Sequence, residues 1–193
     1  ALSRSDKNEW LKAMQQEMKA LQDNNTWDLV DLPHDGKLIG CKWVYKIKQT
    51  VNGEKKYKAR LVAKGFSQKN GENYDEIFAP VVKQTTFRCL LAIASYNKMK
   101  VRHVDVKTAF LYGELDSDIY LKQPEGFIMP GEEGRVCKLN HSLYGLKQSA
   151  RCWNLRINQI LIDSGFKRGK AESCLYIKCN ADSIVYILIY VDD

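Results

Sequence analysis

This sequence lacks the features of several large protein classes. Its longest apolar run, from Ile184 to Val191, is far too short to cross a bilayer. The N-terminus has neither the charged nor the apolar region of a secretory signal. The three histidines, His34, His103 and His141, lie far apart, and no Ser or Cys nucleophile pattern accompanies them. We therefore expect a soluble intracellular protein, and a hydrolase triad has almost no support.

The cysteines form no metal-binding or redox pattern. No CxxC pair occurs, and no His lies at a zinc-ligand spacing from a Cys. We expect reduced thiols in the core at all six positions: Cys41, Cys89, Cys137, Cys152, Cys174 and Cys179.

The sequence does contain enough apolar residues for a folded core. Its 193 residues are 45% apolar and 10% aromatic, which suits one domain or two closely fused subdomains and argues against disorder. The first residue is Ala1 rather than Met, so we expect the chain to be a piece of a longer polypeptide.

Positive charge is concentrated in one part of the chain. The net charge is +7, and residues 37–70 carry ten Lys or Arg against a single acid, Glu54. That segment nets +9, so the remainder is slightly acidic. A one-sided basic stretch attracts a polyanion by counterion release, although a solvated basic face with no partner would have the same composition.

Three segments have the periodicity of helices. Ser5 can cap the first, whose apolar residues recur at helical spacing until Asn24 and Asn25 end it. Thr85 or Thr86 can cap a second helix that continues through residue 94, and a longer helix is predicted over residues 142–163.

Residues 41–66 predict a hairpin with one basic face. Alternation on the first strand separates apolar Trp43, Tyr45 and Ile47 from basic Lys42, Lys46 and Lys48. Asn52 and Gly53 supply a tight turn. Side chains on the returning strand, residues 57–66, also alternate, so its basic residues share one face: Lys58, Arg60 and Lys64.

Further short strands are predicted at residues 101–106, 119–122, 174–178 and 183–190. Residues 180–182 suit a tight turn between the last two. Helices that alternate with short strands in this way indicate an α+β domain rather than a parallel α/β barrel.

Carboxylates follow two of the apolar strands. Asp105 ends the strand predicted at residues 101–106, and Asp192 with Asp193 follows the last strand. Carboxylates at the ends of buried strands are costly unless their charge is compensated, and a divalent cation is the usual compensation. If the two strands lie side by side, three carboxylates can hold a pair of Mg²⁺ ions for phosphoryl transfer. The alternative interpretation is a polar strand end at Asp105 and a simple turn after an edge strand at Asp192 and Asp193.

A series of blocks resembles the copia-type LTR retrotransposon reverse transcriptases, and it covers nearly the whole chain. The blocks stand in the family's order and spacing: NNTWDLVDLP, IGCKWVYKIK, YKARLVAKGFSQ, YDEIFAPVVK, DVKTAFLYGELDSDIYLKQPEGF, VCKLNHSLYGLKQSARCW and YVDD.

The resemblance implies a right-hand polymerase in an α+β fold. It implies fingers at residues 1–83 and 119–150, and a palm at residues 84–118 and 151–193, with an antiparallel sheet backed by helices and no thumb among these residues. The implied activity is that of an RNA-directed DNA polymerase, which copies an RNA or DNA template. We expect residues 1–193 alone to have little of it.

Site residues are carried over by position. The implied metal ligands are Asp105, Asp192 and Asp193, which would hold two Mg²⁺ ions, with Mn²⁺ as a possible substitute. Phe110 resembles the steric gate against a ribose 2′ hydroxyl. Arg60, with Lys58 beside it, resembles the pair that clamps the triphosphate.

Three further residues resemble nucleotide contacts. Tyr144 and Gly145 belong to the block that packs under the nascent base pair, and Tyr144 departs from the Gln of retroviral relatives. Val191 is expected to touch the primer terminus or the nucleotide sugar. Ala150 replaces a Pro that is common in the family, which should matter little because Ala is a good helix former.

The implied partners are a template with its primer, deoxynucleoside triphosphates, and the thumb and RNase H of a Pol polyprotein, without a membrane. Lys42, Lys46, Lys48 and Lys64 are the expected nucleic-acid contacts. The parent element would reside in a cytoplasmic virus-like particle. A catalytically silent nucleic-acid-binding remnant is the main alternative. An unrelated RNA-binding module is disfavoured, because such a module would not require the three carboxylates that this sequence contains.

Overall fold

The computed structural model describes residues 6–49, 53–181 and 183–192. The helices are α1 (Lys7–Asp23), α2 (Gln84–Tyr96) and α3 (Ser149–Asp163), with short 3-10 turns η1 (Gly65–Ser67) and η2 (Ala109–Tyr112). No helix in the described part of the chain is long and apolar enough to cross a membrane. The strands are β1 (Trp27–Val30), β2 (Leu38–Ile39), β3 (Cys41–Gln49), β4 (Lys55–Ala63), β5 (Tyr120–Leu121), β6 (Val136–Leu139), β7 (Lys167–Arg168), β8 (Leu175–Asn180) and β9 (Ser183–Leu188).

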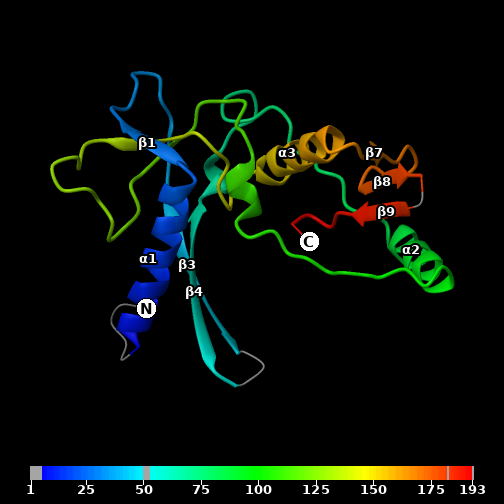
Figure 1. Cartoon of the computed structure of the whole chain (residues 1–193). Helices are drawn as coiled ribbons and strands as arrows, with labels where there is room; N and C mark the ends of the chain where they lie inside the picture. Colours follow the sequence, from blue (N-terminus) through cyan, green and yellow to red (C-terminus); the bar gives the residue numbers. More distant parts are fainter. Residues whose placement is uncertain (1–5, 50–52, 182, 193) are drawn as a thin grey trace.

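These strands form three separate sheets (Figure 1). One sheet has the order β1-β6-β5-β2, in which β2 and β5 run parallel and the other neighbours run antiparallel. The hairpin β3–β4 stands by itself, and β7, β8 and β9 form an antiparallel sheet in sequence order. Helices with mostly antiparallel sheets confirm the predicted α+β class.

Helix α1 packs against the apolar face of the hairpin, as the alternation predicts. Trp10 is buried and meets the rings of Tyr45 and Tyr57 edge to face, with centroids 5.1 and 4.7 Å apart. Ala59 and Met14 complete this contact. The basic residues are left on the opposite face because side chains alternate along each strand.

The main core joins α1, the hairpin and the four-stranded sheet. Leu21 of α1, Leu61 of β4 and Leu121 of β5 are each 1% exposed and belong to one cluster. Leu143 and Leu146, which follow β6, belong to the same cluster. The segment around residue 144 is therefore anchored in the core before it reaches the hairpin.

A smaller core holds the other half of the molecule together. Leu161 of α3 packs on Tyr176 of β8 and on Ile189, which follows β9. Helix α2 lies beyond β9 at the far end from α1 (Figure 1), and no residue of α2 is buried. Its first turn is held by Glu172, whose carboxylate accepts hydrogen bonds from the Lys83 amide at 3.0 Å and the Thr86 hydroxyl at 3.2 Å.

Several predicted elements differ from the structure. Residues 101–106 form no strand, and Val101 and Val104 are 64% and 67% exposed, because no neighbouring strand pairs with this segment. The third helix begins at Ser149 rather than near residue 142, since Gly145 has a φ of +92°. Helix α2 begins at Gln84, so Thr85 and Thr86 lie inside its first turn and cap nothing.

Other predictions are confirmed or lie outside the described residues. Helix α1 ends at Asp23, as Asn24 and Asn25 predict, whereas its expected cap Ser5 and the turn residues Asn52 and Asp182 are not described. All six cysteines are free thiols, but Cys89 and Cys179 are exposed rather than in the core. The pKa of buried Cys137 is raised to about 12 by burial, which keeps it a neutral thiol.

Candidate active site

A hollow of about 410 Å³ lies between α1, the strand β4 and residues 105–108. It brings together residues that stand far apart in the sequence, and most of the predicted nucleotide and metal contacts are among them. The predicted site residues that line it are Lys48, Lys58, Arg60, Asp105, Tyr144 and Asp192.

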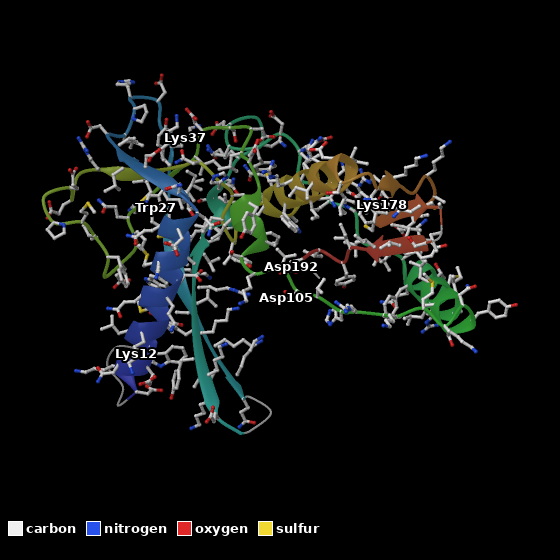
Figure 2. The ribbon with its side chains drawn as sticks, viewed as in Figure 1. Lys12, Trp27, Lys37, Asp105, Lys178 and Asp192 are labelled. Carbon is white, nitrogen blue, oxygen red and sulfur yellow. The ribbon has the colours of Figure 1, made fainter. Side chains whose placement is uncertain are left out.

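The two described carboxylates come from segments that touch through the backbone. The Val106 amide donates to the Asp192 carbonyl at 3.0 Å. Figure 2 shows the labelled Asp105 and Asp192 near one another, in the part of the molecule between the hairpin and the sheet β7–β9. Asp105 is exposed and Asp192 is half-buried, so Asp105 does not end a buried strand as predicted. The third predicted ligand, Asp193, lies outside the described residues.

The turn that carries Asp192 is strained and is held by a tryptophan. Val191 has a φ of +59°, a left-handed conformation that costs a β-branched residue about 1–3 kcal/mol. The indole N–H of buried Trp153 donates to the Val191 carbonyl at 2.7 Å. Helix α3 therefore fixes the backbone beside Asp192, a role that apolar periodicity did not reveal. Whether Val191 touches a primer or a sugar stays a prediction.

Arg60, Tyr144 and Phe110 contact one another in series beside the hollow. The Arg60 guanidinium lies over the Tyr144 ring, 4.6 Å from its centroid. The Tyr144 ring also contacts the Phe110 ring, and the two ring centroids are 4.8 Å apart. Burial is the main cause that raises the pKa of the Tyr144 hydroxyl, so this side chain is neutral at pH 7. Phe110 is half-buried behind Tyr144 and does not line the hollow itself.

Gly145 lets the segment after β6 press onto the end of β4. The Ala63 amide donates to the Tyr144 carbonyl at 2.7 Å. A Cβ on Gly145 would lie 2.3 Å from the Ala63 carbonyl oxygen and 2.5 Å from Val62 Cγ1. The backbone φ of +92° is a second reason for glycine, because residues with a Cβ are strained in this left-handed region. The predicted contact of Gly145 with a base pair is untested, but its packing role is clear.

A buried network of amide side chains supports this contact, and the sequence did not reveal it. Gln68 donates to the Gln148 carboxamide oxygen at 2.9 Å, and Gln148 donates to the Asn73 carbonyl at 2.8 Å. The Lys147 amide donates to the Gln68 carboxamide oxygen at 2.8 Å. Gln68 and Gln148 are 4% and 1% exposed. Polar residues in loops give no sequence signal of burial, which is why they were missed.

Glu17 on α1 is a further residue that sequence reasoning missed. It lines the hollow, is half-buried, and accepts a hydrogen bond from the Leu61 amide at 3.2 Å. Burial raises its pKa above the usual range, and this outweighs the lowering by the Leu61 amide, Arg60 and Lys58. On the helix Glu17 had the pattern of an ordinary solvent-facing residue.

The basic residues are divided between the hollow and the hairpin surface. The register pairs Lys46 with Lys58 and Lys48 with Lys56, so these side chains share one face, and Lys42 lies on it nearer the main core. Lys64 follows β4 and its side chain packs by Gly40 instead. Burial, and then the neighbouring Arg60, lower the pKa of Lys58.

The described carboxylates suit a hard cation but do not complete a metal site by themselves. Among the residues that the structure describes, no three His, Cys, Asp or Glu side chains are grouped so as to hold a metal ion. Carboxylate oxygens such as those of Asp105 and Asp192 are nevertheless the ligands that Mg²⁺ prefers. The magnesium prediction therefore fits the donor chemistry and stays a prediction.

Comparison with known proteins identifies relatives for the whole chain. The chain is 46% identical over 196 residues to the "Retrovirus-related Pol polyprotein from transposon TNT 1-94" of Nicotiana tabacum, a match that covers 100% of this chain and 15% of the relative. It is 42% identical over 186 residues to the corresponding transposon RE1 polyprotein of Arabidopsis thaliana, covering 95% and 13%. A yeast relative, the "Transposon Ty1-DR5 Gag-Pol polyprotein", is 30% identical over 192 residues, covering 97% and 10%.

These relatives confirm the resemblance to copia-type elements, and the chain spans only about a tenth to a seventh of their length. No solved structure matches the chain. The sequence profile described as "Reverse transcriptase (RNA-dependent DNA polymerase)" matches residues 24–193. The chain therefore belongs to the reverse transcriptase family and corresponds to the reverse transcriptase domain of retrotransposon Pol polyproteins.

Proposed function

We propose that the hollow is the nucleotide-adding site of an RNA-directed DNA polymerase, which extends a primer 3′ end with deoxynucleotides. The observation that carries the proposal is the convergence of two cations, Lys58 and Arg60, with two carboxylates, Asp105 and Asp192, around one hollow. Cations on one wall suit a triphosphate, and carboxylates on the other suit the cation-dependent chemistry of phosphoryl transfer.

The wall that carries the cations, formed by β4 with Tyr144 and Glu17, is called the clamp wall and would bind the incoming triphosphate. Arg60 offers a planar fork of donors that matches phosphate oxygens, whereas Lys58 acts as a point charge. Tyr144 holds the guanidinium by its ring face, so Arg60 enters the reaction already oriented. Phe110 packs on Tyr144 and does not line the hollow, so it would act against a ribose 2′ hydroxyl together with the Tyr144 ring.

The other wall, formed by residues 105–108 with 191–192, is called the carboxylate wall and would serve the reacting atoms. Asp105 and Asp192, together with Asp193, would hold two Mg²⁺ ions, or Mn²⁺ in their place, which when bound activate the primer hydroxyl and offset the charge of the leaving pyrophosphate. Trp153 and Val106 keep the Asp192 backbone in place through their hydrogen bonds to the Val191 and Asp192 carbonyls.

The basic face of the hairpin would bind the nucleic acid beside this site. Lys42, Lys46 and Lys48 are exposed on one face, and the Lys48 side chain also reaches the hollow. Phosphate contacts of this kind position a template and primer without reading sequence. The remaining parts of a Pol polyprotein, including thumb and RNase H, would complete the grip in a parent polypeptide.

The test removes one carboxylate charge at a time. In a polymerase polypeptide that contains this chain, Asp105→Asn and Asp192→Asn should each abolish primer extension with Mg²⁺ while the melting temperature stays unchanged. Asp163→Asn is the matched control, because Asp163 ends α3 and is exposed away from the hollow. Retained extension by Asp105→Asn or Asp192→Asn would overturn the assignment. Lack of extension by the unaltered polypeptide would favour a silent nucleic-acid-binding remnant.

A further inference from the structure

Helix α1 supplies part of the candidate active site although it precedes the family pattern. The family profile begins at residue 24, and α1 ends at Asp23. Ala13, Gln16 and Glu17 of this helix nevertheless line the hollow together with Lys58 and Arg60. One side of the hollow is therefore formed by residues that lie before the first residue of the family profile.

Glu17 is the charged member of this wall. Its carboxylate accepts the Leu61 N–H at 3.2 Å, on the edge of β4 that does not pair with β3. Two residues further on, the Ala63 N–H at the same edge donates to the Tyr144 carbonyl at 2.7 Å. Arg60 lies immediately before the first of these anchors, so Glu17 and Tyr144 together fix the strand that carries it.

A neutral side chain would make the same hydrogen bond at lower cost. Glutamine has a carbonyl oxygen in the position of the carboxylate oxygen that receives the Leu61 N–H. The ionised form of Glu17 is opposed by burial, which is the largest influence on its pKa. What the carboxylate adds beyond an amide is therefore a negative charge beside two cations, Lys58 and Arg60.

We propose that Glu17 is a positioning residue and counterion that fixes β4 and limits the affinity of the Lys58–Arg60 pair for polyphosphate. The inference rests on the proposed function, because it assigns a role within the triphosphate side of the same hollow. With the hollow empty, Glu17 reduces the repulsion between the two cations. When pyrophosphate or a triphosphate is bound, the same charge repels it and speeds its release.

The experiment compares two carboxylate-to-amide changes on one helix. In the polymerase polypeptide that contains this chain, Glu17→Gln keeps the hydrogen-bond acceptor and removes the charge. Glu9→Gln is the matched control, because Glu9 is exposed, pairs with Lys12 at 3.1 Å and does not line the hollow. The probes are inorganic pyrophosphate in calorimetry without metal, and deoxynucleotide in steady-state primer extension.

Glu17→Gln should bind pyrophosphate on the order of three to ten times more tightly, as expected when a like charge is removed at close range. The nucleotide KM should fall with it, kcat should not rise, and the melting temperature should not drop. Glu9→Gln should change none of these. A KM that falls while stability holds is a result that a purely structural role would not produce.

Two results would overturn the inference. Unchanged pyrophosphate affinity in Glu17→Gln would show that the charge is irrelevant to the hollow, and weaker affinity would show that Glu17 orients the cations rather than opposing their ligand. The proposed function is judged separately. If the unaltered polypeptide fails to extend a primer while Glu17→Gln still tightens pyrophosphate binding, the polymerase assignment fails and the counterion role stands.

Discussion

The two walls of the hollow are held in place by very different amounts of structure. The clamp wall is anchored by the main core, by two hydrogen bonds at the free edge of β4, and by the cation–π contact between Arg60 and Tyr144. The carboxylate wall is held by the hydrogen bond from the Val106 amide to the Asp192 carbonyl, by the bond from the Trp153 indole to the Val191 carbonyl, and by the adjoining Ile189 in the smaller core. The cations are therefore set in advance, whereas the carboxylates have room to adjust.

This difference suits the two kinds of ligand proposed for the hollow, a triphosphate and metal ions. A triphosphate is recognised through fixed hydrogen-bond donors, and donors that are oriented in advance lower the entropic cost of binding. Carboxylates that receive metal ions can take their final geometry from the ions. Stability is often lowest in the elements that move during function, and α2 without a buried residue belongs to this side of the molecule.

Gly145→Ala should break the comparison most severely, because it detaches Tyr144 from β4. Left-handed strain of roughly 1–2 kcal/mol adds to a clash with backbone atoms of β4, so the loss of unfolding free energy should be about 3 kcal/mol or more. Denaturant unfolding measures it. Gly131→Ala is the control, since Gly131 has a φ of +84° but nothing lies within 4 Å of the added Cβ. Equal losses in the two variants would show that the close approach at Gly145 is unimportant.

Arg60→Ala should sharpen the comparison by weakening the clamp wall alone. Losing a charge-assisted contact of roughly 1.5–3 kcal/mol should raise the nucleotide KM by about ten- to 150-fold, with little change in kcat. Steady-state primer extension provides both constants. Arg60→Lys should lie between wild type and Ala, because it keeps a charge but loses the fork and the stack on Tyr144. An unaltered KM in Arg60→Ala would make Arg60 a simple surface charge.

Glu172→Gln should destabilise the docking of α2 by about 1 kcal/mol, because neutral hydrogen bonds replace charge-assisted ones. Burial raises the pKa of Glu172, but the bonds from the Lys83 and Cys174 amides and the Thr86 hydroxyl outweigh it and leave the pKa lowered. A lowered pKa means that the stabilisation is complete above the ordinary glutamate range and is lost as pH falls through the lowered pKa.

Hydrogen exchange over α2 reports both effects. Amides of α2 should lose protection in Glu172→Gln at neutral pH and in wild type under acid, while α3 amides serve as the internal control. If protection of α2 is independent of both, Glu172 is not the anchor of that helix.

Lys46→Ala should have the smallest effect, because Lys46 lies on the hairpin surface and is absent from the lining of the hollow. Affinity for an RNA/DNA hybrid should fall only slightly, and the slope of log affinity against log salt should become shallower by about one. Lys170→Ala, at an exposed position after β7, should leave the slope as it is. A slope unchanged by Lys46→Ala would remove this lysine from the contact surface.

Patterns with a strong local cause were predicted well from the sequence. Strict alternation predicted the two faces of the hairpin, and helical periodicity predicted the third helix and its end at Asp163, although that helix begins at Ser149 rather than near residue 142. The block resemblance located Arg60, Asp105, Tyr144 and Asp192, which the structure brings to one hollow. The division into fingers and palm stays a prediction.

Features that depend on distant partners were not predictable. Residues 101–106 have β-branched residues, but a strand needs a neighbour to pair with, and none is placed there. Glu17 looked like a solvent-facing helix residue, because nothing local shows that α1 crosses the free edge of β4. The amides of Gln68 and Gln148 are buried only because two loops meet.

The hairpin register has a thermodynamic consequence of its own. Lys46 stands opposite Lys58, and Lys48 stands opposite Lys56, and like charges directly across a sheet destabilise it. The hairpin thus folds against its own repulsion, which any bound polyanion relieves. By linkage, a polyanion that binds the folded hairpin would stabilise it by RT ln(1 + [L]/Kd), so a nucleic acid bound there would increase the order of β3 and β4. For the same reason, the stability of this hairpin, the most basic part of the chain, would show whether a polyanion is bound to it.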